Sequence, residues 1–365
     1  MSNYYSNSGK KSNKRSSKEL ALLVVDITVM VAMALLIFLS LTAVICQYIS
    51  PEKSGVLSVI ALGVPIIYLL DMVVMFYWIV RQRWYCTLAM VLIVLLGLFY
   101  LSKYYRIDFD REYDTKFSER KYTKVMTYNV HEGKDSHLVE YIDMHNPDIL
   151  CLQEMNVYTE NWRALEDRYN TTLIKESWTY HQILTKYKII RKGLFEGIDP
   201  MNAVWADLKI KDDTVRVISL HLNSTAIRLE DTEFLESHKY LTDSERDTKL
   251  RSIFSRLVEN NQKRADQARK VAEFKSQTPY KMIVCGDFND VPLSYTYRVI
   301  AKGLDDTFSE MAKGSAYTFN TRYNLLRIDN ILVSPSIEVV SYDVDNEVEM
   351  SDHFPVISRL EFARK

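Results

Sequence analysis

Asp287 and Asn289 lie two residues apart, directly after a short apolar segment, Met282–Cys285. The segment has the length and composition of a buried strand, and Gly286 permits a tight turn at its end. Residues two apart in an extended chain point the same way, so a carboxylate and an amide oxygen face one space. Such an oxygen-rich site suits a phosphate group with Mg²⁺, although Asp and Asn also form ordinary turns.

Five further stretches combine an apolar run with polar side chains near its end. Strand ends meet at the edges of a sheet, so side chains of this kind can gather in one place. The candidate residues are Asn129 in MTYNV (126–130), Glu154 in LQE (152–154), His221 in SLHLNS (219–224), Asp329 in RIDNILVSP (327–335), and Asp352 and His353 in SDHFPV (351–356).

This ordered set of motifs resembles the endonuclease/exonuclease/phosphatase superfamily, which has the deoxyribonuclease I-like fold. The resemblance runs from about Lys121 to Phe362, and GDFND followed by SYTYR (294–298) is similar to the bacterial, membrane-tethered branch. It implies a four-layer α/β sandwich, in which two packed mixed β-sheets are flanked by helices and the motif residues meet at one rim. Alternating strand and helix patterns, followed by a strand-rich end, also favour an α/β class.

The resemblance implies that Glu154, Asn129 and Asp352 form a metal cluster. The expected cofactor is Mg²⁺ or Mn²⁺, since Mg²⁺ binds through one or two carboxylates and keeps several of its waters. Hydrolysis of a phosphoester needs such an ion to neutralise phosphate oxygens, together with a base that activates water.

The remaining candidates are expected to act on the water and the phosphate. A carboxylate bonded to one imidazole nitrogen raises the basicity of the other, so Asp329 would orient His353 as general base or as a direct stabiliser of the phosphate. By resemblance, Asp287 orients the attacking water and Asn289 holds a phosphate oxygen. His221 contacts the phosphate or protonates the leaving group. Whether His353 or Asp287 takes the proton stays open.

Structural roles are the alternatives for several of these residues. Asp329 would then cap a turn, His221 would be a satisfied core histidine, and Asn129 would pin a loop. For Arg327, bracing of the sheet is expected over contact with phosphate.

One stretch departs from the family pattern. Family members often carry glycine-rich sequence before the strand that positions a substrate-contacting side chain, whereas this chain has SWTYHQILTKY (177–187). Tyr180 and His181 are the available replacements, and which side chain contacts the substrate in this region stays open.

Three apolar stretches, Leu20–Tyr48, Val56–Val80 and Trp84–Leu101, precede the motifs. The first two exceed the roughly 20 residues that cross a bilayer, and the third is slightly shorter. We therefore expect three transmembrane helices. The resulting organisation is a disordered basic cytoplasmic tail (1–19), a three-helix anchor (20–101), a juxtamembrane linker (102–121) and the catalytic domain (122–365).

Charge predicts the orientation of the anchor. The basic tail and the Arg81–Arg83 loop are expected on the cytoplasmic side, which places the catalytic domain in the periplasm or otherwise outside the inner (cytoplasmic) membrane. Asp26 and Asp71 lie within the spans, where a charge is costly. We expect them to pair with hydroxyl groups, to be protonated or to reach the interface.

The substrate is less well defined by the sequence. Residues 107–365 carry a net charge of −7, and nucleic-acid-binding domains are usually basic. A lipid headgroup or another small phosphoester is therefore slightly favoured over DNA or RNA, and a non-catalytic membrane scaffold is the third possibility.

The polar insertion Asn223–Gln262 has helical spacing in Leu250–Val258, and a second helix is predicted at Lys263–Phe274. The insertion packs on the domain, covers the substrate or rests on lipid.

Overall fold

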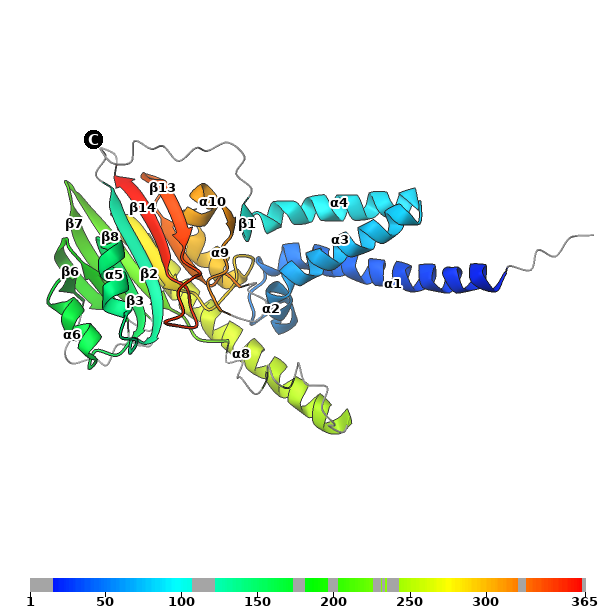
Figure 1. The fold of residues 1–365 in the computed structure, drawn as a ribbon, viewed down its shortest axis with the longest axis horizontal. Coiled ribbons are helices and arrows are strands. Elements are labelled where there is room, and N and C mark those ends of the chain that lie inside the picture. Colours follow the sequence, from blue (N-terminus) through cyan, green and yellow to red (C-terminus); the bar gives the residue numbers. More distant parts are fainter. Residues whose placement is uncertain are drawn as a thin grey trace, which may run out of the picture.

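The computed structural model describes residues 16–106, 122–172, 181–195, 203–225, 231, 234, 243–320 and 326–362. Most of the expected basic tail, the linker from residue 107 to 121, and Tyr180 lie outside these ranges, as does part of the 223–262 insertion. Figure 1 shows a two-sheet domain from which the helices α1, α3 and α4 project side by side.

The domain contains two six-stranded sheets, and each combines parallel and antiparallel pairs. Parallel pairing joins β2 to β3 and β8 to β9. One sheet has the order β10 (Asp305–Asp306), β12 (Asp329–Val333), β9 (Lys281–Asp287), β8 (Asp213–His221), β7 (Ala203–Ile210) and β6 (Lys188–Leu194). The other has the order β13 (Ile337–Val344), β14 (Val356–Phe362), β2 (Thr123–Glu132), β3 (Ile149–Met155), β5 (Gln182–Thr185) and β4 (Asn170–Thr171).

The sheets pack face to face, and helices cover their outer faces. Val125, Cys151, Val217 and Cys285 belong to the fully buried core that both sheets share. The helices α5 (Leu138–His145) and α6 (Glu160–Glu166) pack on the sheet that contains β2. On the sheet that contains β9, α8 (Asp243–Ser276) and α9 (Tyr295–Ala301) do the same. The predicted four-layer α/β sandwich is therefore confirmed.

The short elements fill the edge of the domain that is nearest the N-terminal helices. The helix α10 (Thr307–Met311) follows β10, and β11 (Gly314–Ser315) pairs with β1 (Tyr105–Arg106). Because β1 comes directly after the last N-terminal helix, this pairing ties the end of that helix to the domain.

The insertion contains one long helix where two were predicted. The helix α8 runs without a break from Asp243 to Ser276, so the expected interruption before Lys263 is wrong. The physical reason is visible in the sequence, because no Gly or Pro lies between these ends to stop the helix.

The N-terminal third forms α1 (Ser17–Cys46), α2 (Gly55–Leu62), α3 (Val64–Val80) and α4 (Trp84–Leu101). By length and composition, α1 and α4 can cross a membrane, and α2 with α3 add a third span if this pair, bent by 66°, counts as one. The transmembrane helix expected over Val56–Val80 is thus broken at Gly63. Pro65 follows in the first turn of α3, where its missing N–H is tolerated.

The two aspartates of the apolar helices are paired. Asp26 accepts hydrogen bonds from the Tyr77 hydroxyl at 2.6 Å and from Arg81 Nε at 2.8 Å and Nη2 at 2.7 Å. Asp71 accepts a bond of 2.5 Å from the Ser40 hydroxyl. Pairing with hydroxyl groups was expected, whereas the ion pair of Asp26 with Arg81 was not.

Candidate active site

The strand pairing places the candidate residues at one rim of the sandwich. Asn129 and Glu154 come from the carboxyl-terminal parts of the parallel neighbours β2 and β3. His221 and Asp287 are direct partners at the ends of the parallel neighbours β8 and β9, and Asp329 pairs with Asp287 across the antiparallel pair β12 and β9. Parallel strands end at the same edge, so these five side chains come together.

Gly286 lies inside β9, paired with Leu220 and Asn330, and the strand ends at Asp287 instead of turning at Gly286 as expected. Its φ is +124°, and a Cβ atom at this position would lie 2.0 Å from the carbonyl oxygen of Leu220. Glu154 and Asn289 also adopt positive φ, 55° and 51°, which costs energy in residues that have a Cβ. Strained backbone of this kind concentrates at functional sites.

Asp287, Asp329 and His353 form the buried centre of the site. His353 Nδ1 lies 2.9 Å from Asp329 Oδ2, and His353 Nε2 lies 3.7 Å from Asp287 Oδ2. The backbone N–H of Asp329 donates to the Thr318 hydroxyl at 3.0 Å. The ligand atoms of the three central residues lie within 4.8 Å of one another, and the three residues form a candidate acidic and histidine group for a metal ion.

Electrostatics in this centre keep the imidazole charged. Burial opposes the charge on His353, but Asp329 and Asp287 outweigh it and raise the pKa of His353 to about 10. For Asp287, burial raises the pKa above its ordinary value, and the nearby charge of Asp329 acts in the same direction.

A second group of side chains lies toward solvent. His131 Nδ1 is 3.7 Å from Glu154 Oε2 and 3.8 Å from Asp352 Oδ1. Asn129 Nδ2 donates to Glu154 Oε1 at 2.9 Å and to Asp287 Oδ2 at 3.3 Å. Two partly exposed carboxylates therefore converge on one space, and Asn129 connects this space to the buried centre.

His221 and Asn289 complete the set. His221 Nε2 lies 3.5 Å from Glu154 Oε1 and 3.6 Å from Asp287 Oδ2. The amide nitrogen of Asn289 donates to the Leu222 carbonyl at 3.0 Å and to Asp287 Oδ2 at 3.1 Å. All the candidate residues thus meet, although in this arrangement the Asn289 amide nitrogen is engaged within the protein.

Three residues of the site had no role in the sequence-based set. His131 lies between the two outer carboxylates, and Thr318 binds the backbone of the strand that carries Asp329. Ser351 donates to the carbonyl oxygen of Asn129 at 2.8 Å. His131 follows Asn129 by two residues, so the spacing argument applied to Asp287 and Asn289 would have found it. Thr318 carries no comparable local signal.

The structure also shows the surroundings of His181 and Arg327. The buried ring of His181 packs edge-on against His221, with 4.9 Å between ring centres. Burial is the main cause that lowers the pKa of His181 well below its ordinary value, so its ring is neutral. Arg327 lies away from the rim, buried in an ion pair with Asp306, and braces the sheet as expected.

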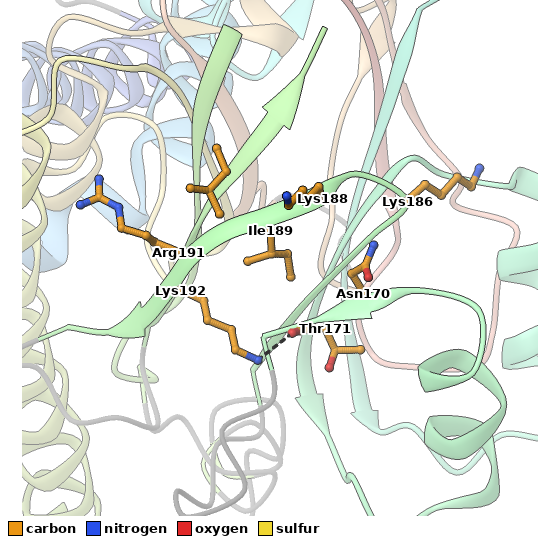
Figure 2. A pocket seen from close by; sticks show the side chains of 8 residues that line it. Asn170, Thr171, Lys186, Lys188, Ile189, Arg191 and Lys192 are labelled. Atoms are coloured by element: carbon orange, nitrogen blue, oxygen red, sulfur yellow. Dashed lines mark hydrogen bonds between the residues drawn. The ribbon is translucent and has the colours of Figure 1, made fainter. Parts of the chain in front are cut away.

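A basic groove lies at the edge of the sandwich that is formed by β4 and β6, the terminal strands of the two sheets. Lys186, Lys188, Arg191 and Lys192 line it together with Asn170 and Thr171, as Figure 2 shows. Much of its charge is already bound within the protein. Lys192 donates to the Thr171 carbonyl at 3.0 Å, Lys186 to the Asn146 carbonyl at 2.9 Å, and Arg191 pairs with Asp207 at 2.9 Å.

A sequence model of the Endonuclease/Exonuclease/phosphatase family matches residues 126–353. This range covers most of the chain and contains every candidate residue. The chain belongs to the Endonuclease/Exonuclease/phosphatase family. It therefore has the fold of a hydrolase that acts on phosphoester bonds. A second model, for a domain of unknown function (DUF8431), matches residues 26–104. No curated protein is significantly similar in sequence.

Several solved structures align with about two thirds of this chain. A humanized D. rerio TDP2 shares 17% identity over 66% of this chain and 99% of its own, with a TM-score of 0.47. The human Nocturnin catalytic domain shares 18% identity over 66% and 95%, with a TM-score of 0.45. A Bacteroides thetaiotaomicron mannosyl-6-phosphatase shares 20% identity over 66% and 100%, with a TM-score of 0.43.

Proposed function

We propose that this family member is a membrane-anchored phosphoesterase that depends on Mg²⁺ or Mn²⁺ and acts outside the cytoplasm. The observation that carries the proposal is the convergence of the Glu154 and Asp352 carboxylates beside the buried Asp287–His353–Asp329 group. A fold that only binds a partner has no need to hold like charges together at a strained rim.

Glu154, Asp352 and Asn129 would hold the ion. Their chemistry fits the ion, since two oxygen donors face one space and side-chain exposures of 35% and 49% leave room for its waters. When bound, the ion would neutralise charge on the phosphate oxygens. His131 lies 3.7 Å from Glu154 and would neighbour both the ion and the substrate.

The buried residues would act on the reacting atoms. His353, oriented by Asp329 and kept charged, would stabilise the phosphate. Asp287, whose pKa is raised by burial, would hold the attacking water and accept its proton. His221 is within 3.6 Å of Asp287, a position from which its ring can contact the phosphate or protonate the leaving oxygen. Asn289 now braces Asp287, so a phosphate contact would require it to give up one of its present bonds.

A lipid headgroup or another small phosphoester is the favoured substrate. The net charge of −7 in residues 107–365 disfavours a polyanion. The apolar N-terminal helices also contact the segment that follows Asp287, since Val291 and Leu293 pack in one cluster with residues of α1 and α3. A site attached in this way is suited to substrates in the same membrane.

Nucleic acid is the second candidate, and the basic groove is the observation that favours it. Four Lys and Arg side chains line this groove, and cationic grooves bind phosphate backbones without regard to sequence. Lys188→Gln removes one of these charges far from the proposed chemistry. It should weaken hydrolysis of DNA or RNA, if nucleic acid is the substrate, and leave hydrolysis of small esters unchanged.

The test is a substrate panel on the full chain in nanodiscs, with Mg²⁺ or Mn²⁺. The panel contains lipid headgroup esters, nucleotides, single- and double-stranded DNA, and RNA. Asp287→Ala and His353→Ala should abolish turnover while thermal unfolding stays cooperative, and Lys188→Gln serves as the control for the small esters. Turnover retained in either variant would reject the assigned roles. Absence of any hydrolysis with either metal would favour the scaffold alternative.

The orientation has a separate test. A reporter fused after Lys365 should be active only in the form that reports an extracytoplasmic position. Activity confined to the cytoplasmic form would overturn the proposed periplasmic or otherwise external location.

A further inference from the structure

The segment that carries Asp287 and Asn289 ends against the N-terminal helices. Val291 and Leu293 are fully buried in a cluster that includes Cys46 of α1 and Tyr68 of α3. The thiol of Cys46 lies 3.5 Å from the Leu293 carbonyl oxygen. This apolar contact begins two residues after Asn289, so the N-terminal helices bear directly on the backbone that shapes the site.

A polar route runs beside this apolar contact. Asp290, next to Asn289, lies 3.5 Å from the Arg264 guanidinium, and the Arg264 side chain is completely buried. Arg264 also donates to the Asn223 carbonyl at 2.8 Å and to the side chain of Asn261. Asn261 in turn donates to the Ser58 hydroxyl of α2 at 2.8 Å. One buried arginine therefore connects the active-site segment, residues 287–294, to α2. We call the helices α1 to α4 together the N-terminal unit.

The free-energy cost of burying the Arg264 guanidinium indicates that this contact does more than attach the domain to a membrane. Burying a guanidinium costs several kcal/mol unless partners in good geometry offset the loss of water. A tether needs only a covalent linker and surface contacts. Here the buried charge lies between α2 and a segment in which Asn289 is held at a φ of 51°. Such strained backbone persists only where the surroundings over-determine it.

We propose that the N-terminal unit is a positioning element of the active site. By packing against α8, α2 fixes Asn261 and Arg264. Arg264 fixes Asp290 and, through it, the neighbouring Asn289 that braces Asp287. The proposal rests on the proposed function for its effect on turnover, and it gives a role to the region that matches a domain of unknown function.

The most direct test is a substitution that moves α2 relative to α8. Gly55, the first residue of α2, faces Val258 of α8 so closely that a Cβ would lie 2.4 and 2.8 Å from its Cγ atoms and 3.2 Å from its Cβ. Rotating the valine cannot clear all three contacts, so Gly55→Ala must push α2 away from α8. Neither residue belongs to the proposed catalytic machinery.

The expected result is a loss of turnover with little change in KM. A displacement of about 1 Å away from the chemistry can cost up to about 100-fold, so kcat of Gly55→Ala should fall about 10- to 100-fold. Val258→Ala removes the two Cγ atoms, which make the closest contacts, and should restore kcat in the double variant. Gly63→Ala, whose Cβ would meet its nearest neighbour at 3.6 Å, is the matched control and should behave like wild type.

Hydrogen exchange gives a readout that does not depend on activity. The Phe288 amide donates to the Ile328 carbonyl and the Ser294 amide to the Val291 carbonyl, both at 2.9 Å. In full-length protein in nanodiscs, exchange of the amides of residues 288–291, 293 and 294 should accelerate in Gly55→Ala and return to normal in the double variant.

Each outcome decides one question. Gly55→Ala with wild-type turnover and exchange, or a loss that Val258→Ala does not reverse, would overturn the positioning role. If wild-type protein hydrolyses nothing in the panel, the proposed function fails. The exchange experiment alone then decides whether the N-terminal unit positions this segment.

Discussion

Removal of the Asp306 carboxylate should destabilise the domain strongly, because it leaves a buried arginine without its partner. Arg327 donates to Asp306 Oδ1 at 3.2 Å and to Oδ2 at 2.6 Å, and the Tyr297 hydroxyl donates to the same Oδ2 at 2.6 Å. The guanidinium lies 4.5 Å from the ring centre of Phe308, and its side chain is 1% exposed. The buried guanidinium would therefore lose its only charged partner among the described residues.

The expected loss follows from the burial of the pair. Breaking one partner of a buried ion pair costs about 3–5 kcal/mol, and 1 kcal/mol corresponds to about 2–4 °C in Tm for a domain of 150–250 residues. Asp306→Ala should therefore lower Tm by roughly 6–20 °C. Replacing both partners with apolar residues, as Asp306→Leu with Arg327→Met, should cost much less, since no charge is left unpaired.

The pH dependence has a defined sign. Burial alone would raise the pKa of Asp306, but Arg327 outweighs it, and the pKa lies below its ordinary value. A carboxyl group with a lowered pKa contributes stability that is present above its unfolded value, about 3.9, and lost as the pH falls through the folded value. The difference in Tm between wild type and Asp306→Ala should be constant from pH 5 to 7 and shrink below about pH 4.

The assay is thermal unfolding of the full chain in detergent, followed by tryptophan fluorescence. Wild type, the single variant and the double variant are compared at about pH 3, 5 and 7, which covers both sides of the unfolded pKa. Two results would refute the reasoning: an Asp306→Ala variant within about 1 °C of wild type at pH 7, or a double variant no more stable than the single one.

Three further predictions concern the site. Gly286→Ala should abolish folding or lower stability by more than about 3 kcal/mol, because its Cβ would lie 2.0 Å from the Leu220 carbonyl oxygen; a Tm within a few degrees of wild type would contradict this. Asp329→Asn should lower kcat about 10- to 100-fold with an unchanged far-UV circular dichroism spectrum, since it removes the charge that orients His353; wild-type kcat would show that this carboxylate only caps a turn. Glu154→Gln should raise the Mg²⁺ or Mn²⁺ concentration that gives half-maximal activity, and calorimetric titration with Mn²⁺ should show weaker binding; unchanged binding would remove Glu154 from the ion site.

The fold class and the grouping of side chains at the rim could be predicted because each motif lies within a few consecutive residues. Each motif couples a strand-length apolar run to a polar side chain, and the pairing of parallel strands then brings residues such as Asn129 and Glu154 to one edge. This inference needs no knowledge of distant contacts. Residues such as Thr318 were not found because their partners come from other elements, here the backbone of Asp329 at 3.0 Å.

The N-terminal third was less predictable for the same reason. Hydropathy gives the length of an apolar stretch but not its packing, so the bend between α2 and α3 at Gly63 was missed. The position of α2 depends on contacts such as Asn261 with Ser58, which are 203 residues apart in the sequence. Likewise, the partner of Asp26 was not identified because Arg81 is brought to it only by the packing of α1 against α3.

The cluster shared by Cys46, Tyr68, Val291 and Leu293 would have a kinetic consequence under the proposed membrane anchoring. A packed interface with helices that lie in a bilayer would prevent the domain from tumbling independently, and the rim that carries the site would stay at one height above the lipid. A substrate dissolved in that lipid would arrive by lateral diffusion within the plane. Its rate would then follow the mole fraction of the substrate in the surface and fall on dilution with inert lipid, even when the bulk concentration is held constant.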